Sequence, residues 1–294
     1  MRKASALSRL VASGIAAGVL LGGCGQAPAP HALSAVQSSA PAAGAPAAAA
    51  GPGAAGGVAG RYNAPGVDPA GYVIRNPASG RDEVVLPDMR HTALLIGDSQ
   101  SEPADGWPRL GLAAVGYKVH FCGLGGTGFV AANEKTGNYI DALEQGDWKL
   151  PYGAPALIVI QGGGNDAARG ATDAQIEANA ERLINALQER YPGATMALIG
   201  TLARGADHGG GRRTQVDALL GTLAVRHGIP FVGVGDWLTK YNLAKNLADA
   251  VHMDAAGRKT LGGLLESRLR QLRLELQPTG GTVPSAATPQ VPAS

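Results

Sequence analysis

The sequence has no run of lysine and arginine and no large surplus of either charge. Of its 294 residues, 25 are Lys or Arg and 23 are Asp or Glu. Three of the basic residues, Arg2, Lys3 and Arg9, lie in a segment that we expect to be removed, and 25 less 3 leaves 22 basic against 23 acidic groups. Such a chain lacks the basic surface that binds phosphate backbones. We therefore expect no nucleic-acid partner.

Cysteine is also scarce, with only Cys24 and Cys122 in the chain. Cys24 ends the segment Leu21-Gly22-Gly23-Cys24, which follows a basic start and an apolar stretch from Leu10 to Leu21. This order is typical of a bacterial export signal and is too short to predict a membrane span. It resembles the lipobox, whose cysteine receives a diacylglyceryl group and becomes the mature N-terminus.

We expect residues 1–23 to be a lipoprotein signal peptide. A lipidated Cys24 would then hold the exported protein at the outer face of the bacterial cytoplasmic membrane or in the cell envelope. The alternative is an ordinary cleaved signal with an incidental cysteine. With Cys24 lipidated, Cys122 has no partner for a disulfide, and we expect it to be a buried, inert thiol.

Aromatic residues are nearly absent from the first quarter of the chain and from its last twenty residues. Ala, Pro, Gly and Ser dominate there, and such a composition buries too little apolar surface to offset the entropy of ordering. We predict a disordered tether over residues 24–87 and a disordered tail over residues 276–294. One domain remains between them, over residues 88–275.

Within this domain, short β-branched runs alternate with helical patterns, as in a parallel sheet covered on both faces. The predicted helices begin after Thr172, which forms a capping-box pattern with Gln175, near residue 214 and after Asp254. The pattern predicts an α/β fold, a flavodoxin-like three-layer α/β/α sandwich with a five-stranded parallel sheet. Its predicted strands are Thr92 to Gly97, Tyr117 to Cys122, Ala156 to Gln161, Thr195 to Gly200 and Ile229 to Val234.

Polar motifs follow several of these strands, whose carboxyl ends share one edge of such a sheet. The first strand leads into Gly97-Asp98-Ser99 and the third into Gly162-Gly163-Gly164-Asn165-Asp166. Each motif alone is also typical of an ordinary turn or helix cap. Asp249 and His252 follow the last strand at a spacing that lets a carboxylate orient an imidazole, although a surface Asp/His pair has the same spacing.

The second strand is followed by a glycine-rich loop, residues 123–128, that formally satisfies the dinucleotide-binding pattern G-x-G-x-x-G. The loop lies on the second strand rather than the first, and no acidic residue follows at the expected spacing. A loop that offers a backbone N–H to a developing oxyanion fits better.

In chain order, these four motifs resemble those of the SGNH (GDSL-type) hydrolases, from about His91 to Leu274. The resemblance implies that Ser99 is the nucleophile and that Asp249 and His252 complete its triad. It implies an oxyanion hole made by the N–H groups of Ser99 and Gly126 and by the Asn165 side chain. Asp98 and Asp166 would support these loops.

Two positions depart from the family pattern. The second motif, which contains Gly126, lacks the asparagine that often begins this loop, since the chain has Cys122 or Gly123 there. Gln100 replaces the usual apolar residue after Gly-Asp-Ser, a change that we expect not to touch the chemistry.

The resemblance implies a serine esterase that forms an acyl-enzyme without a cofactor. We also expect no metal, because His91, His120, His208 and His227 show no paired ligand spacing of the zinc type. An acetylated glycan and a lipid ester are both possible substrates, and the sequence does not choose between them. An O-acyltransferase acting on cell-surface glycan would use the same triad, and a lipoprotein that only binds a glycan or lipid could retain the same fold. The tryptophans Trp107, Trp148 and Trp237 could stack on a sugar, although core packing is the default.

Overall fold

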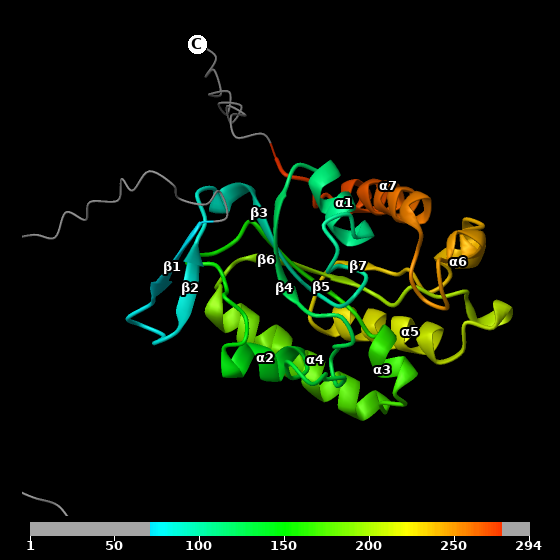
Figure 1. Cartoon of the computed structure of the whole chain (residues 1–294), viewed down its shortest axis with the longest axis horizontal. Coiled ribbons are helices and arrows are strands. Elements are labelled where there is room, and N and C mark those ends of the chain that lie inside the picture. The colour runs from blue at the N-terminus through cyan, green and yellow to red at the C-terminus, as the bar shows by residue number, and fades with distance from the viewer. Residues whose placement is uncertain (1–70, 278–294) are drawn as a thin grey trace, which may run out of the picture. The chain divides into compact units, whose positions relative to one another are not determined.

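A computed structural model describes residues 71–277, and its centre is a five-stranded parallel sheet (Figure 1). The strand order is β4-β3-β5-β6-β7, with every neighbouring pair parallel. The predicted α/β fold and its five strands are confirmed, with small shifts at the strand ends. The strands are β3 (Thr92–Gly97), β4 (Lys118–Gly123), β5 (Leu157–Gln161), β6 (Thr195–Ile199) and β7 (Phe231–Val232).

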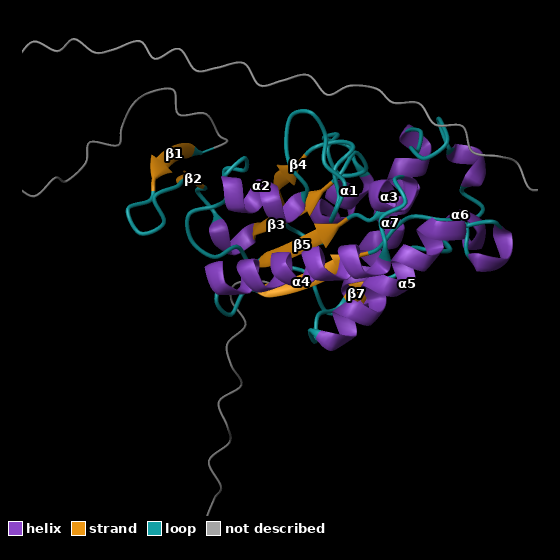
Figure 2. Ribbon diagram, turned by 90° about the horizontal axis from the view of Figure 1, so that it is seen from below, coloured by secondary structure: helices purple, strands orange, loops and turns teal. Residues whose placement is uncertain are grey.

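Helices cover both faces of the sheet, which explains why β3 and β5 are buried along their whole length and apolar except at Thr92 and Gln161. One face packs against α1 (Trp107–Ala114), α6 (Trp237–Lys240) and α7 (Ala255–Gln271). The layer on the other face is in front in Figure 2 and is formed by α2 (Tyr139–Gln145), α3 (Gly164–Ala168), α4 (Asp173–Arg190) and α5 (Gly211–Arg226). Three short 3₁₀ helices lie in connections: η1 (Met89–His91), η2 (Ala206–His208) and η3 (Ala244–Asn246).

Helix α4 begins where its sequence predicts. Thr172 and Gln175 form the expected capping box, with the Gln175 N–H donating to the Thr172 hydroxyl at 3.2 Å. Asp254 caps α7 in a similar way, because its side chain accepts the Gly257 N–H at 2.6 Å. This cap lies two residues after His252, and α7 starts at the next residue.

The prediction that the disordered tether extends to residue 87 is wrong for its last residues, which are folded. Strands β1 (Tyr72–Arg75) and β2 (Asp82–Val85) pair antiparallel within that range. The hairpin is fastened to the domain by an ion pair of 2.6 Å between Glu83, whose side chain is 2% exposed, and Arg190. The β-branched residues on both sides of a turn were the overlooked signal.

The predicted tail also begins slightly too early. Leu276, which we assigned to the tail, donates its N–H to the Val115 carbonyl at 3.0 Å and packs beside Gly116. The signal peptide, Cys24 and most of the tether and tail lie outside the described residues.

Several expectations about burial are confirmed. Trp107, Trp148 and Trp237 are all buried, so none of them offers an open ring for a sugar. Cys122 is also buried, and burial raises the pKa of its thiol to about 12. No helix between residues 71 and 277 is long and apolar enough to cross a membrane.

Candidate active site

Ser99 lies in a tight turn directly after β3. The carbonyl of Asp98 accepts the N–H groups of Ser101 and Glu102, both at 2.9 Å, and so reverses the chain. Gly97 makes the turn possible, because a Cβ there would lie 2.6 Å from the Ser101 side chain. The turn presents Ser99, which is partly exposed, at the carboxyl edge of the sheet.

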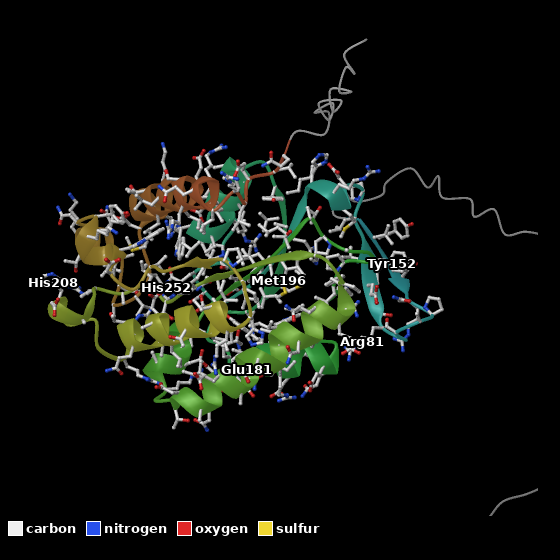
Figure 3. All side chains as sticks on the ribbon, turned by 180° about the vertical axis from the view of Figure 1, so that it is seen from behind. Arg81, Tyr152, Glu181, Met196, His208 and His252 are labelled. Atoms are coloured by element: carbon white, nitrogen blue, oxygen red, sulfur yellow. The ribbon has the colours of Figure 1, made fainter. Side chains whose placement is uncertain are left out.

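His252 and Asp249 reach Ser99 from the loop before α7. The Ser99 hydroxyl and His252 Nε2 are 2.9 Å apart, and His252 Nδ1 lies 2.8 Å from Asp249 Oδ2. Figure 3 labels His252 at the end of the molecule opposite to Arg81 and Tyr152. These three residues, far apart in sequence, form one hydrogen-bonded chain in the order that nucleophilic catalysis requires.

The Asp249 carboxylate is held within its own loop as well. Its Oδ1 accepts the backbone N–H groups of His252 and Val251, each at 2.8 Å. These two backbone bonds, followed by the bond from the His252 ring, hold the pKa of Asp249 well below its usual range. Asp249 therefore stays ionised and can orient the imidazole, although its side chain is 56% exposed.

The glycine-rich loop after β4 leaves one amide available beside Ser99. From Gly125 to Ala131, every backbone N–H of this described loop except that of Gly126 donates to a protein acceptor. Gly126 has φ of +81°, a conformation that favours glycine. The Ser99 N–H likewise has no acceptor within residues 71–277. These two groups are the backbone donors expected for an oxyanion hole.

Asn165 and Asp166 join the loop after β5 to the glycine-rich loop. Asn165 Nδ2 donates to the Thr127 carbonyl at 2.9 Å, which leaves its second hydrogen for a ligand. Asp166 is fully buried and accepts three consecutive amides, those of Phe129, Val130 and Ala131, at 2.7 to 3.0 Å. We expected Asp166 to hold its own loop, whereas it holds the neighbouring one.

Asp98 is directed away from the imidazole, as expected for the neighbour of a nucleophile. Its Oδ1 accepts the Gln100 N–H at 2.9 Å. When the Gln161 amide is turned with its nitrogen toward Asp98, that nitrogen also donates to Oδ1, at 3.2 Å. Burial raises the pKa of Asp98 to about 6, against an ordinary value of 3.8. Asp98 braces the turn and does not contact His252.

Gln100 has a role that we did not expect from the sequence. Its Nε2 donates to the Val251 carbonyl at 2.9 Å, and its Oε1 accepts the Trp107 indole N–H at 3.1 Å. Val251 immediately precedes His252, so this side chain ties the nucleophile loop to the histidine loop. The signal was the polar residue at a position where the family usually has an apolar one, a difference to which the sequence alone assigned no role.

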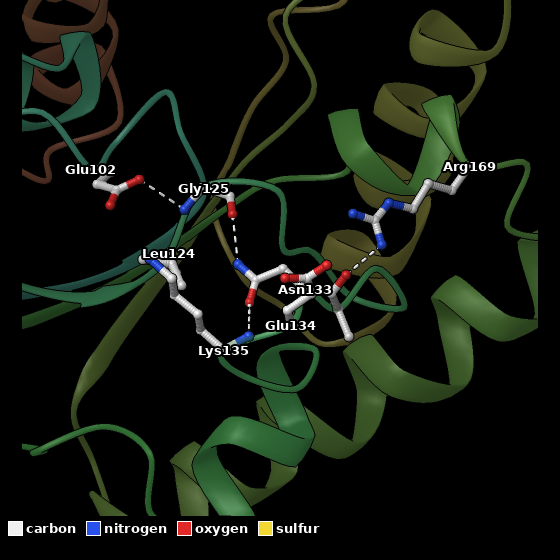
Figure 4. Close-up of a pocket in the computed structure, with 8 residues that line it drawn as sticks. Glu102, Leu124, Gly125, Asn133, Glu134, Lys135 and Arg169 are labelled. Carbon is white, nitrogen blue, oxygen red and sulfur yellow. Dashed lines mark hydrogen bonds between the residues drawn. The ribbon is translucent and has the colours of Figure 1, made fainter.

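Two open cavities flank Ser99. One, of about 690 Å³, is shown in Figure 4 and is lined by Glu102, Leu124, Gly125, Ala132, Asn133, Glu134, Lys135 and Arg169. The other, of about 420 Å³, is lined by Ser99, Gln100, Glu102, Pro103, Ala248, Asp249, His252, Met253 and Arg258. Glu102 lies on the boundary of both. His208 is exposed on η2 and lines neither cavity. In the described part of the chain, no three His, Cys, Asp or Glu side chains gather as metal ligands.

Comparisons with known proteins agree with this architecture. The model of the GDSL-like lipase/acylhydrolase family matches residues 92–260, which is more than half of the chain. The chain therefore belongs to this family. No curated protein matches the sequence.

The chain is similar to several solved structures at low sequence identity. A family two carbohydrate esterase from Cellvibrio japonicus is 16% identical with a TM-score of 0.50, over 64% of this chain and 62% of that one. A family two carbohydrate esterase from Clostridium thermocellum is 14% identical with a TM-score of 0.48, over 64% and 65%. The match thus spans less than two thirds of both enzymes. Est24, a carbohydrate acetylesterase from Sinorhizobium meliloti, is 17% identical with a TM-score of 0.45, over 62% and 99%.

Proposed function

We propose that the protein hydrolyses short-chain acyl esters, acetyl esters in particular, through an acyl-enzyme on Ser99. The observation that carries this proposal is the continuous chain from Asp249 through His252 to the Ser99 hydroxyl, with contacts of 2.8 and 2.9 Å. His252 accepts the hydroxyl proton as Ser99 attacks the ester carbonyl, and it then protonates the departing alcohol. Water, activated by the same imidazole, releases the acid.

The negative charge that develops on the carbonyl oxygen needs donors that the protein does not already use. The N–H groups of Ser99 and Gly126 have no other acceptor in the described structure, and Asn165 has a second amide hydrogen. Donors of this kind act strongly because they are already oriented when the charge forms.

The cavities beside Ser99 favour a short acyl group on a polar alcohol. Charged residues line both of them, and each has only a short apolar stretch, made by Leu124 and Ala132 in one and by Pro103, Ala248 and Met253 in the other. A long alkyl chain gains about 0.8 kcal/mol for each buried CH₂ only where an apolar surface receives it. An acetylated glycan is therefore the first substrate to test, ahead of a lipid ester, and a protein of this fold from Cellvibrio japonicus is described as a carbohydrate esterase.

The test is hydrolysis of p-nitrophenyl esters of increasing chain length by the purified protein and by its Ser99→Ala and His252→Ala variants. We expect activity that falls with chain length and is lost in both variants. Wild-type activity in Ser99→Ala would overturn the proposal. A folded wild-type protein that hydrolyses no ester but transfers acetyl groups to an added glycan would instead be an O-acyltransferase.

We also propose that Cys24 is lipidated and holds the domain at the outer face of the cytoplasmic membrane or in the cell envelope. The support is the order Leu21-Gly22-Gly23-Cys24 after a basic and apolar leader. Metabolic labelling with an alkyne fatty acid should mark the wild-type protein and not Cys24→Ser. Equal labelling of both, or none of either, would contradict this proposal.

A further inference from the structure

The peptide group between Gly125 and Gly126 has a particular place beside Ser99. Its N–H belongs to Gly126 and is the free amide of the glycine-rich loop, whereas its C=O belongs to Gly125. In a trans peptide these two groups point in opposite directions, and the described chain has no cis peptide. Whatever holds the Gly125 carbonyl therefore also sets the direction of the Gly126 N–H.

Asn133 holds that carbonyl. Its Nδ2 donates to the Gly125 oxygen at 2.9 Å, as the dashed line in Figure 4 shows. The Asn133 side chain is itself fixed, because its Oδ1 accepts the N–H groups of Lys135 at 2.8 Å and Thr136 at 3.0 Å. A side chain held in such a turn loses little further freedom when it binds the carbonyl.

Glu102 holds the preceding peptide group. Its Oε2 accepts the Gly125 N–H at 2.8 Å from the nucleophile turn. Gly125 lies against the nucleophile, because a Cβ on it would be 3.4 Å from the Ser99 Cβ. The peptide groups on both sides of Gly125 are thus held by side chains, and the Gly126 N–H is the group left to face a ligand.

We propose that Asn133 is a positioning residue for the oxyanion hole, which holds the Gly125 carbonyl so that the Gly126 N–H is directed at the developing oxyanion. This rests on the proposed esterase function. The bond to the carbonyl also polarises the peptide and strengthens its N–H as a donor. Asn133 acts through the peptide and does not contact the reacting atoms.

Two substitutions at Asn133 separate this role from support of the turn. Asn133→Asp keeps the oxygen that Lys135 and Thr136 use but cannot donate to the Gly125 carbonyl. Asn133→Ala also loses that donor, and it adds no charge. We expect kcat for p-nitrophenyl acetate to fall by about 10- to 100-fold in both, somewhat less than when a donor is removed outright. KM should stay within about threefold, because the donor acts mainly on the transition state.

Asn179, which lies on α4, is a matched control. Its Nδ2 donates to the Phe129 carbonyl at 2.8 Å, the same kind of bond to the same loop but at a different peptide. Asn179→Asp should keep kcat within about threefold of wild type. The carbonyl stretching frequency of a slowly deacylating cinnamoyl-enzyme adds a direct measure of the oxyanion hydrogen bonds. It should rise in both Asn133 variants and not in Asn179→Asp.

These experiments distinguish a failure of the role proposed for Asn133 from a failure of the proposed esterase function. An active wild type, an inactive Ser99→Ala and Asn133 variants with unchanged kcat would overturn the role of Asn133 alone. If kcat fell in Asn133→Asp but not in Asn133→Ala, the added charge would be the cause, and the proposed role of Asn133 would again be overturned. An equal fall of kcat in Asn179→Asp would overturn that role as well. A folded wild type without esterase activity would instead overturn the proposed function.

Discussion

The side chain of Gln100 is hydrogen-bonded to the carbonyl of Val251, at 2.9 Å, across 151 positions of sequence. Gln100 follows the nucleophile directly, and Val251 directly precedes the histidine. The two loops that must meet for proton transfer are therefore joined by a bond that does not involve the reacting atoms. The same side chain accepts the indole N–H of Trp107 at 3.1 Å, so both of its ends are held.

Gln100→Met should weaken this connection while keeping the volume of the side chain. The Val251 carbonyl and the Trp107 indole would lose their partner, which should lower the free energy of unfolding by about 1 to 3 kcal/mol. A looser histidine loop should lower kcat roughly tenfold. Chemical denaturation and ester hydrolysis measure both effects. Unchanged values of both would show that the Gln100 contact is incidental.

Asp249→Asn tests the orientation of the imidazole. The amide oxygen can still accept the N–H groups of Val251 and His252, but its NH₂ group would face His252 Nδ1 and favour the wrong tautomer. We expect kcat to fall by about 10² to 10⁴-fold with the fold retained. In the wild type, protonation of Asp249 should not be the event that ends activity as the pH falls, because the backbone bonds keep the pKa of Asp249 well below its usual range. A variant with more than a tenth of wild-type kcat would argue that another carboxylate completes the triad.

Asp98→Asn should change how stability depends on pH. Burial raises the pKa of Asp98 to about 6 from 3.8, so the folded protein binds this proton more tightly than the unfolded chain does. The contribution of Asp98 to stability therefore decreases as the pH rises from about 4 to about 6. The variant should gain stability relative to wild type over this range, by up to roughly 3 kcal/mol. Denaturation curves at pH 4 and pH 7 check this, and a difference that does not change with pH would refute it.

Asp166→Ala should damage both the fold and the oxyanion loop. Three buried or partly buried amides would lose their acceptor, at a cost on the order of 3 kcal/mol or more. Activity should fall even where the variant remains folded, because Gly126 lies only three residues before the segment that Asp166 holds. Asp207→Ala, at an exposed position on η2, is the control in the same melting and kinetic assays. Equal stability of the two variants would contradict the account.

The sheet and the order of the site motifs could be predicted because they are local properties of the sequence. The runs that form β3 and β5 each contain at least four consecutive residues without a polar side chain, which only a strand covered on both faces requires. Parallel strands then bring Ser99, the glycine-rich loop, Asn165 and His252 to one edge without further information.

The contacts that hold the site could not be predicted in this way. The bonds from Asn133 to Gly125 and from Gln100 to Val251 depend on how loops fold back, and neither pairing leaves a periodic pattern. The hairpin of β1 and β2 was missed for another reason. Each strand has only four residues, and the surrounding Ala, Gly and Pro outweighed the short apolar runs in composition.

The most direct test of the catalytic centre is to identify the residue that a p-nitrophenyl phosphonate modifies, by intact mass and peptide mapping. The account predicts a single adduct on Ser99, no adduct in Ser99→Ala, and slow labelling in His252→Ala, since the imidazole activates the hydroxyl. An adduct on another residue, or an unchanged rate of labelling without His252, would contradict the assignment of Ser99 and His252 as nucleophile and base.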